Sequence, residues 1–351
     1  MYRRLAVIAA AAVVLAALPI YLESFWLQTG LFAMASIIAA IGLTILVGTA
    51  GQLSLAHAFF VAIGAYGYSF LAGQEVPGAD GPAGLGLPPL LALIGAVLLA
   101  GLAGALFSPI SGRVRGIYLG LASLGLVFLG QHILQNATGI TGGYRGIAVP
   151  PFSLFGFSFS NTSPDSLVIL GVPFGTLERL WYLGLVLVVA ALLYGRNLVR
   201  SRPGRAMAMI RDSEIAAATN GIDVVRYRAA AFTVSSMYAG LGGVLMALAF
   251  GRIVPESFGF LLSVDFLVMV VIGGAGSVGG AAAGAVFVTA LPLVLNHYSG
   301  SLPLLAEPGT GGVGASEFSR FIYGAAIVAV LLFARDGLAG LVHRSRKEPV
   351  A

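Results

Sequence analysis

Long apolar runs dominate the chain, and polar residues are concentrated in the stretches between them. A run of about 20 apolar residues is long enough to cross a bilayer as a helix. Ten such runs are predicted at residues 5–22, 29–47, 53–72, 88–110, 116–136, 180–195, 229–250, 263–275, 279–296 and 319–334. The eighth run is short, so the hairpin over 263–296 is expected to include a broken or re-entrant segment. The pattern predicts an all-α polytopic membrane protein with about ten transmembrane helices.

The first apolar run has two interpretations. Arg3 and Arg4 precede residues 5–22, which is also the layout of a secretory signal peptide. The run is long for a signal core, and another apolar run follows almost at once. We therefore expect a retained first span, and a cleaved signal peptide is the alternative.

Basic residues predict the orientation of these spans. Cytoplasmic loops of membrane proteins carry an excess of lysine and arginine. With the N-terminus in the cytoplasm and the spans alternating, 15 of the 19 basic residues fall inside. The four that fall outside are Arg145, Arg179, Arg252 and Arg320. Both termini are therefore expected in the cytoplasm.

Two polar stretches are longer than the rest. The external one, about 137–179, is rich in glycine, serine, proline and aromatic residues, and the internal one, about 196–228, is basic. Neither is large enough to form a soluble enzyme domain. Residues 1–351 are therefore expected to form a single membrane domain.

Composition supports the membrane assignment and excludes several kinds of chemistry. Hydrophobic residues make up 58% of the chain and charged residues 9%, whereas soluble domains carry about 25% charged residues. The chain has no cysteine, so cysteine-ligated metals and thiolate catalysis are excluded. The only lysine, Lys347, follows Arg346, so no phosphate-binding Gly-Lys motif exists. Its four histidines match no metalloprotease motif. We expect no catalytic residue, metal or cofactor, and no nucleotide-binding site of the phosphate-loop kind in this chain.

One segment of the internal loop has the features of a short helix. Asp212 or Ser213 can cap its N-terminus, and Glu214 is favoured by the positive end of the helix dipole. The alanines at 216–218 favour helix, and Gly221 can end it in the left-handed conformation. This helix is too polar to insert into the bilayer. Its small residues favour docking into a cleft of a partner protein, and a solvated linker helix is the alternative.

Polar residues inside apolar runs are candidates for a translocation pathway, because they are costly in lipid and usually face the protein interior. The third predicted span begins with three of them, the fifth contains three, and the eighth begins with one. They are Gln52, Ser54, His57, Ser123, Gln131, His132 and Asp265. Hydrogen bonding between helices is an equally good explanation for each.

Two glycine-rich interruptions stand at comparable places. Residues 48–51 and 273–276 each interrupt an apolar hairpin on the predicted cytoplasmic side. Transporters often carry broken helices at corresponding positions of two halves. Chance explains this similarity about as well, because glycine and alanine are so common in the chain.

Four segments, in order, resemble the branched-chain amino-acid ABC permeases of the LivM type. They are residues 48–66, 141–147, 202–227 and 263–284, and together they cover most of residues 40–290. The second resembles the external loop of that family and contains Thr141, Gly142, Gly143 and Arg145.

The resemblance implies how the internal helix is used. Glu214, Ala216, Ala217 and Gly221 stand at positions that match the cytoplasmic motif of ABC importer permeases, with Arg211 just before them. In that family the helix fits a groove on the ATPase subunit. These residues are therefore candidates for coupling to ATP hydrolysis.

The resemblance also implies the partners and the cargo. It predicts a non-catalytic permease in the bacterial inner membrane, with two ATPase subunits, a second permease subunit and a periplasmic or extracellular solute-binding protein, and with no nucleic acid. Branched-chain or related amino acids are the expected solutes, and urea, amides or another small solute are alternatives. An ion-coupled secondary transporter is disfavoured, because such proteins usually need buried ionisable groups and only Asp265 lies near a span.

Overall fold

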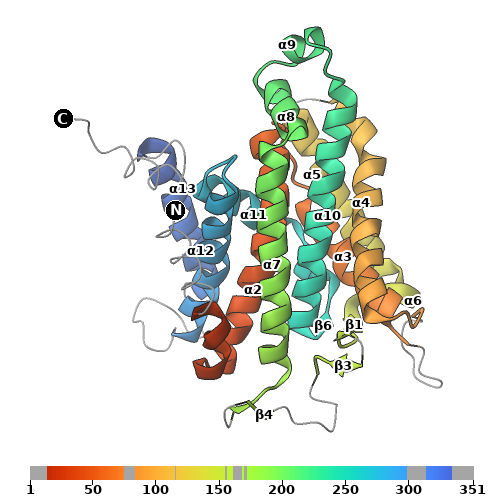
Figure 1. Cartoon of the computed structure of the whole chain (residues 1–351), viewed down its shortest axis with the longest axis vertical. Coiled ribbons are helices and arrows are strands. Elements are labelled where there is room, and N and C mark those ends of the chain that lie inside the picture. The colour runs from red at the N-terminus through yellow and green to blue at the C-terminus, as the bar shows by residue number, and fades with distance from the viewer. Residues whose placement is uncertain are drawn as a thin grey trace.

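The computed structural model forms a bundle of long helices with short strand pairings at one end (Figure 1). It describes residues 14–74, 84–114, 116–154, 156–160, 168–169, 172–298 and 314–333. The first predicted span, 5–22, lies partly outside these residues, and residues 14–21 of it are helical. The C-terminal tail after residue 333 also lies outside them.

The elements follow one another along the chain with few long connections. The helices are α2 (Ser24–Leu43), α3 (His57–Ala72), α4 (Pro89–Arg113), α5 (Ile117–Asn136), α6 (Thr138–Thr141), α7 (Thr176–Arg200), α8 (Arg202–Asp212), α9 (Glu214–Thr219), α10 (Val224–Phe250), α11 (Phe260–Gly273), α12 (Val278–His297) and α13 (Ala315–Phe333). The π-helix η1 (Thr44–Thr49) continues α2, and the 3₁₀ turns are η2 (Gly143–Arg145) and η3 (Pro255–Phe258). Antiparallel pairs join β1 (Ile147–Ala148) to β6 (Arg252–Ile253), β2 (Ser153–Leu154) to β3 (Phe157–Ser158), and β4 (Val168–Ile169) to β5 (Val172–Pro173).

The predicted spans and the observed helices agree closely. In the described part of the chain, seven helical segments are long and apolar enough to cross a membrane. They comprise α2 with η1, α4, α5, α7, α10, η3 with α11, and α12. Helix α3 has the expected position, but its 16 residues make it shorter than a full span. The total of ten spans and the orientation of the termini remain predictions.

Two segments differ from the sequence prediction. The third run was expected to be helical from about residue 53, but residues 50–56 are not helical and α3 begins only at His57. The chain turns there at Gly51, whose φ of 68° is left-handed. In the internal loop, α8 is a second helix that the sequence prediction missed. Ser201 caps it by accepting a hydrogen bond from the Gly204 amide, and Pro203 occupies its first turn.

Helix α10 lies at the centre of the bundle and packs against α2, α3 and α4. Glycine allows these helices to approach closely. A Cβ atom on Gly64 of α3 would collide with the backbone of Gly240 on α10, and one on Gly243 would collide with the backbone of Val61. The abundance of glycine is thus explained in part by helix packing.

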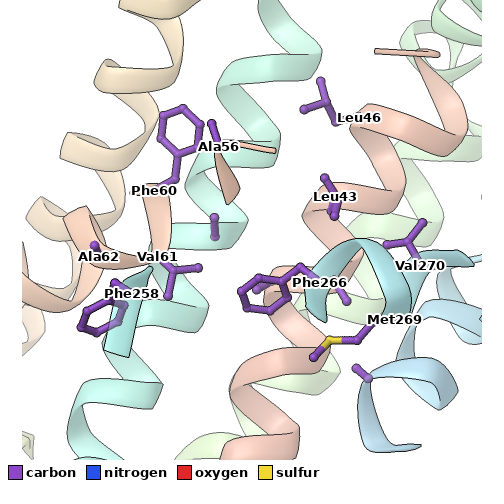
Figure 2. Close-up of a cluster of buried hydrophobic side chains, with 14 of the residues drawn as sticks. Leu43, Leu46, Ala56, Phe60, Val61, Ala62, Phe258, Phe266, Met269 and Val270 are labelled. Atoms are coloured by element: carbon purple, nitrogen blue, oxygen red, sulfur yellow. The ribbon is translucent and has the colours of Figure 1, made fainter. Parts of the chain in front are cut away.

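A buried apolar cluster joins α2, α3, α10 and α11. Figure 2 shows Leu43 of α2, Phe60 and Val61 of α3, and Phe266 and Met269 of α11 among its members. Helices α8 and α9 lie at one end of the bundle, and the β1–β6 and β2–β3 pairs lie at the other (Figure 1). The two long polar loops predicted from the sequence are therefore at opposite ends of the molecule.

Candidate functional site

The short helix predicted in the internal loop is confirmed as α9. The Ser213 hydroxyl accepts a hydrogen bond from the Ala216 amide at 3.2 Å, so Ser213 is the N-cap. Gly221 has a φ of 78°, and the next amide, of Ile222, donates to the Ala217 carbonyl at 3.0 Å. The helix therefore begins and ends at the residues that the sequence indicates.

One face of α9 is attached to the protein and the other is exposed. The Glu214 carboxylate accepts hydrogen bonds from both terminal nitrogens of Arg228 on α10, at 2.9 and 3.1 Å. Ala217 is fully buried, whereas Ala216 and Gly221 are exposed. Ile215, which the sequence analysis did not single out, is 80% exposed. An apolar side chain therefore projects from the tip of the bundle beside the candidate coupling residues.

The helices α8 and α9 are linked to η1 and to the non-helical residues that follow it. Arg211 of α8 donates a hydrogen bond from Nη1 to the Gly48 carbonyl at 2.6 Å, and its Nη2 pairs with Asp212 at 2.9 Å. Gln52 donates from Nε2 to the Arg228 carbonyl at 3.2 Å. Arg228 thus links two candidates that are distant in sequence, because its carbonyl accepts from Gln52 while its side chain pairs with Glu214.

The polar side chains at the start of α3 bond mostly to backbone groups. The Leu55 amide donates to the Ser123 hydroxyl of α5 at 2.8 Å. The Ala56 amide donates to the Ser54 hydroxyl at 3.2 Å. His57 is 1% exposed, and its Nε2 lies 2.7 Å from the Ala39 carbonyl. The structure brings Gln52, Ser54, His57 and Ser123 into one region next to α5.

A further serine in this region was overlooked by the sequence analysis. Ser263 of α11 is buried and accepts a hydrogen bond from the Ala58 amide at 3.0 Å. Its neighbour Phe266 packs edge-on against the His57 ring, with centroids 5.2 Å apart. A lone serine in an apolar run carries little signal by itself. The signal that could have found it is the break in the span before α3, because the backbone amides at such a break need hydrogen-bond acceptors.

The remaining pathway candidates lie elsewhere. On α5, Gln131 is half-buried beside Gly259, and His132 is exposed, with Asn136 donating to the His132 carbonyl at 2.8 Å. Asp265 is half-buried on α11, within electrostatic range of Arg320 on α13. It does not join the group at the start of α3.

The predicted external loop borders an open pocket of about 1460 Å³. Gly142 and Arg145 line it, together with the end of α3, the start of α4 and Arg252. Thr141 fixes the turn behind it by donating to the Leu134 carbonyl at 2.6 Å and by accepting from the Gly143 amide at 3.2 Å. Arg145 and Tyr144 are exposed, so this end of the bundle presents a cation and an aromatic ring on its surface.

The capacity of the site to bind a metal ion depends on its histidine, cysteine and acidic side chains. Among the described residues no group of three histidine, cysteine or acidic side chains is arranged to hold a metal ion. The polar side chains of the site instead contact backbone carbonyls and amides. The arrangement is suited to holding and moving helices.

Comparison with known proteins gives the family. The family model described as "branched-chain amino acid transport system / permease component" matches residues 25–331. The chain is 32% identical over 323 residues to the high-affinity branched-chain amino acid transport system permease protein LivM of Escherichia coli (strain K12). This match covers 90% of this chain and 70% of that protein. It is 26% identical over 308 residues to the corresponding permease protein LivH of Salmonella typhimurium, over 86% of this chain and 90% of that protein.

No solved structure matches the chain significantly. The family model and the LivM relatives cover the central helices, the internal loop and the external loop alike. The resemblance predicted from four segments is therefore confirmed over nearly the whole described bundle. The chain belongs to the branched-chain amino acid transport permease family, as a non-catalytic, multi-pass membrane subunit of an ABC transporter.

Proposed function

We propose that this chain forms the translocation pathway of an ATP-driven importer for branched-chain or related amino acids in the bacterial inner membrane. Residues 1–351 act as a single permease domain. Two ATPase subunits dock on the end that carries α8 and α9, and a solute-binding protein docks at the opposite end, over the pocket beside Arg145. The solute class follows the names of the LivM and LivH relatives.

The observation that carries the proposal is the isolated, capped helix α9 at the tip of the bundle. It has no apolar face long enough to lie in a bilayer, and a single apolar side chain, Ile215, projects from it. The ion pair between Glu214 and Arg228 fixes it to α10. A helix of this kind suits a groove on another protein, so Arg211, Glu214, Ala216, Ala217 and Gly221 form the ATPase-coupling set.

The second permease subunit is assigned to the exposed face of α5. This helix is apolar enough to span the membrane, yet it exposes His132, which is costly against lipid. A second subunit across the pathway would cover His132. Salmonella typhimurium has relatives of this chain named LivM and LivH, which favours a heterodimeric pair of permeases.

Replacement of Ile215 by glutamate tests the proposed docking of the ATPase subunits. Ile215→Glu places a charge where an apolar contact is proposed, so the ATPase subunits should no longer co-purify with the permease. Val225→Glu is the control, because Val225 is 64% exposed on α10, outside α9. Co-purification of Ile215→Glu at the wild-type level would remove the support for docking through α9.

Orientation is tested with single cysteines, which the natural chain lacks. Tyr144→Cys should react with a membrane-impermeant thiol reagent added outside intact cells, and Thr219→Cys should react only after the membrane is opened. Both positions are exposed, so access to the reagent decides the result. The opposite pattern would invert the proposed topology.

A further inference from the structure

We infer that residues 44–56, named the linking segment here, transmit movement of α8 and α9 to the pathway helices, and that Arg211 and Gln52 are the positioning residues that connect it. The segment consists of η1 and the non-helical residues before α3. The inference deepens the proposed function and rests on it, because it assigns the physical route between ATPase docking and the pathway.

The backbone of the linking segment departs from α-helix while it stays inside the protein. The Ala50 amide donates to the Ile45 carbonyl and the Gln52 amide to the Leu46 carbonyl, both at 3.0 Å, which are wider turns than an α-helix makes. Such π-turns are rare and occur often at functional sites. Leu46 and Ala56 are members of the buried apolar cluster (Figure 2). The segment is thus a packed but irregular part of the core.

The cytoplasmic helices hold the segment at two points. Arg211 of α8 donates to the Gly48 carbonyl at 2.6 Å and also packs on Gly51, where an added Cβ would lie 2.6 Å from the Arg211 Cγ. Gln52 donates to the backbone carbonyl of Arg228, whose side chain holds Glu214 of α9. A shift of either helix therefore pulls on the linking segment through a hydrogen bond.

The same segment contacts three membrane helices on its other side. The amide of Leu55 donates to Ser123 of α5, and the amide of Ala58, just beyond the segment, donates to Ser263 of α11. Gly48 lies against the backbone of Gly276, in the turn between α11 and α12. The two glycine-rich interruptions noted in the sequence are thus in contact. Movement of the segment therefore reaches α5 through Leu55, the turn between α11 and α12 through Gly48, and α11 through Ala58 at the start of α3.

Buried polar atoms without partners gather around this segment. Among the described residues seven such side-chain atoms occur, and three belong to Thr44, Thr49 and Gln52. A fourth is Nε of Arg228, and a fifth is the hydroxyl of Ser235 on α10, the helix against which η1 packs. Buried polar groups are nearly always paired. The linking segment and its neighbours on α10 therefore contain polar groups that the surrounding helices do not bond, in contrast to the apolar cluster beside them.

The test uses the complete importer, with the permease pair, ATPase subunits and binding protein in proteoliposomes. In Arg211→Met the ATPase should still co-purify, but its stimulation by loaded binding protein should fall about fivefold or more, the usual size of coupling between sites. Arg211→Lys keeps a donor for the Gly48 carbonyl and should restore part of the stimulation. Arg226→Met is the control, because it removes an exposed positive charge from the same loop, and it should keep the wild-type stimulation.

Movement itself is measured by thiol labelling on α5. In a Gln131→Cys background, labelling rates with and without ATP should differ in the complete importer. Adding Arg211→Met should abolish that difference although the ATPase remains bound. Gln52→Met loses the hydrogen-bond donor to the Arg228 carbonyl but has a side chain of similar size, so it should have the same effect. It replaces Arg211→Met in the test if that variant does not accumulate in the membrane.

The outcomes separate the two proposals. If the importer with wild-type permease shows no stimulation by loaded binding protein, the proposed function fails and the linking segment loses its role with it. If that importer is stimulated and both Arg211→Met and Gln52→Met keep the stimulation and the ATP-dependent labelling, the linking segment alone is overturned. An equal loss in Arg226→Met would likewise overturn it, because the effect would then come from charge at the ATPase interface.

Discussion

The two ends of the bundle, which are proposed to be external and cytoplasmic and are named so here, hold their connecting segments by different means. At the external end, the β1–β6 and β2–β3 pairs fix the loop, and Arg179, which is 6% exposed, donates to the carbonyls of Phe174 and Ser158 at 3.1 and 2.7 Å. At the cytoplasmic end, α8 and α9 reach the pathway helices through the Arg211 and Gln52 side chains. The first end is held by paired backbone and a buried guanidinium, whereas the Arg211 and Gln52 side chains join the helices of the second end to the glycine-rich linking segment.

This difference in how the segments are held fits the function proposed for each end. A surface on which a binding protein docks needs a fixed shape, because every group that must be ordered on binding lowers the affinity. A coupling element must instead have two arrangements of similar free energy. Substitutions at the external end should therefore change stability most, and substitutions at the cytoplasmic end should change coupling most.

The largest expected effect on stability comes from Arg179→Met. It removes a buried guanidinium that also donates to the Ser160 carbonyl at 3.2 Å, so several carbonyls lose a charged donor. Such losses together should cost about 3 kcal/mol or more. The melting temperature of the purified protein in detergent should fall sharply. Arg252→Met is the control, since its side chain donates to a single exposed carbonyl, that of Arg145. Equal melting temperatures for the two variants would contradict the comparison.

An intermediate effect is expected from Gly146→Ala. Gly146 has a φ of 66°, and a Cβ there would collide with the Ile253 carbonyl in β6. Strain and overpacking should together cost about 2 kcal/mol. Gly156 has a φ of 88° but open space around it, so Gly156→Ala should cost only the strain, about 1 kcal/mol. Equal unfolding midpoints in denaturant would show that the β1–β6 contact does not stabilise the external end.

Much of the fold can be predicted from the sequence, because a span is specified by the length of its apolar run. Helix α9 is equally predictable, since Ser213 and Gly221 are local cap signals that need no tertiary information. The non-helical residues 50–56 were missed because small and apolar residues there continue the pattern of the span. Helix α8 was missed because Pro203 and Gly204 suggest a turn, although proline is well tolerated in the first turn of a helix.

The site is less predictable than the fold, because its contacts join residues that are far apart in sequence. In the sequence, Arg228 is only one of the basic residues predicted to be cytoplasmic. Its pairing with Glu214 depends on how α9 folds back on α10. Arg179 was counted as an external cation, although it is buried. The polar residues at the start of α3 can be identified individually from the sequence, but the bond from Gln52 to the Arg228 carbonyl and the bond from Arg211 to the Gly48 carbonyl of η1 required the structure.

The smallest effect on stability is expected from Gly221→Val, at the cytoplasmic end. A β-branched residue at a φ of 78° costs about 1 kcal/mol or more in strain, and no neighbour lies within 4 Å to collide with it. The cost is confined to the end of α9, so the melting temperature should stay close to that of wild type, while ATPase stimulation by loaded binding protein is lost. Gly251→Val places equal strain at a φ of 69° at the external end and should keep the stimulation. A normal stimulation in Gly221→Val would make α9 a passive linker.

Import of branched-chain or related amino acids by this permease should depend on ATP and on a binding protein. This dependence can be measured as uptake of radiolabelled leucine by proteoliposomes that contain the complete importer, ATP on the ATPase side, and no ion gradient. We expect accumulation that requires both ATP and the binding protein, that Ile215→Glu abolishes, and that unlabelled valine inhibits but urea does not. Accumulation driven by an ion gradient without ATP, or inhibited by urea and not by valine, would overturn the proposed function.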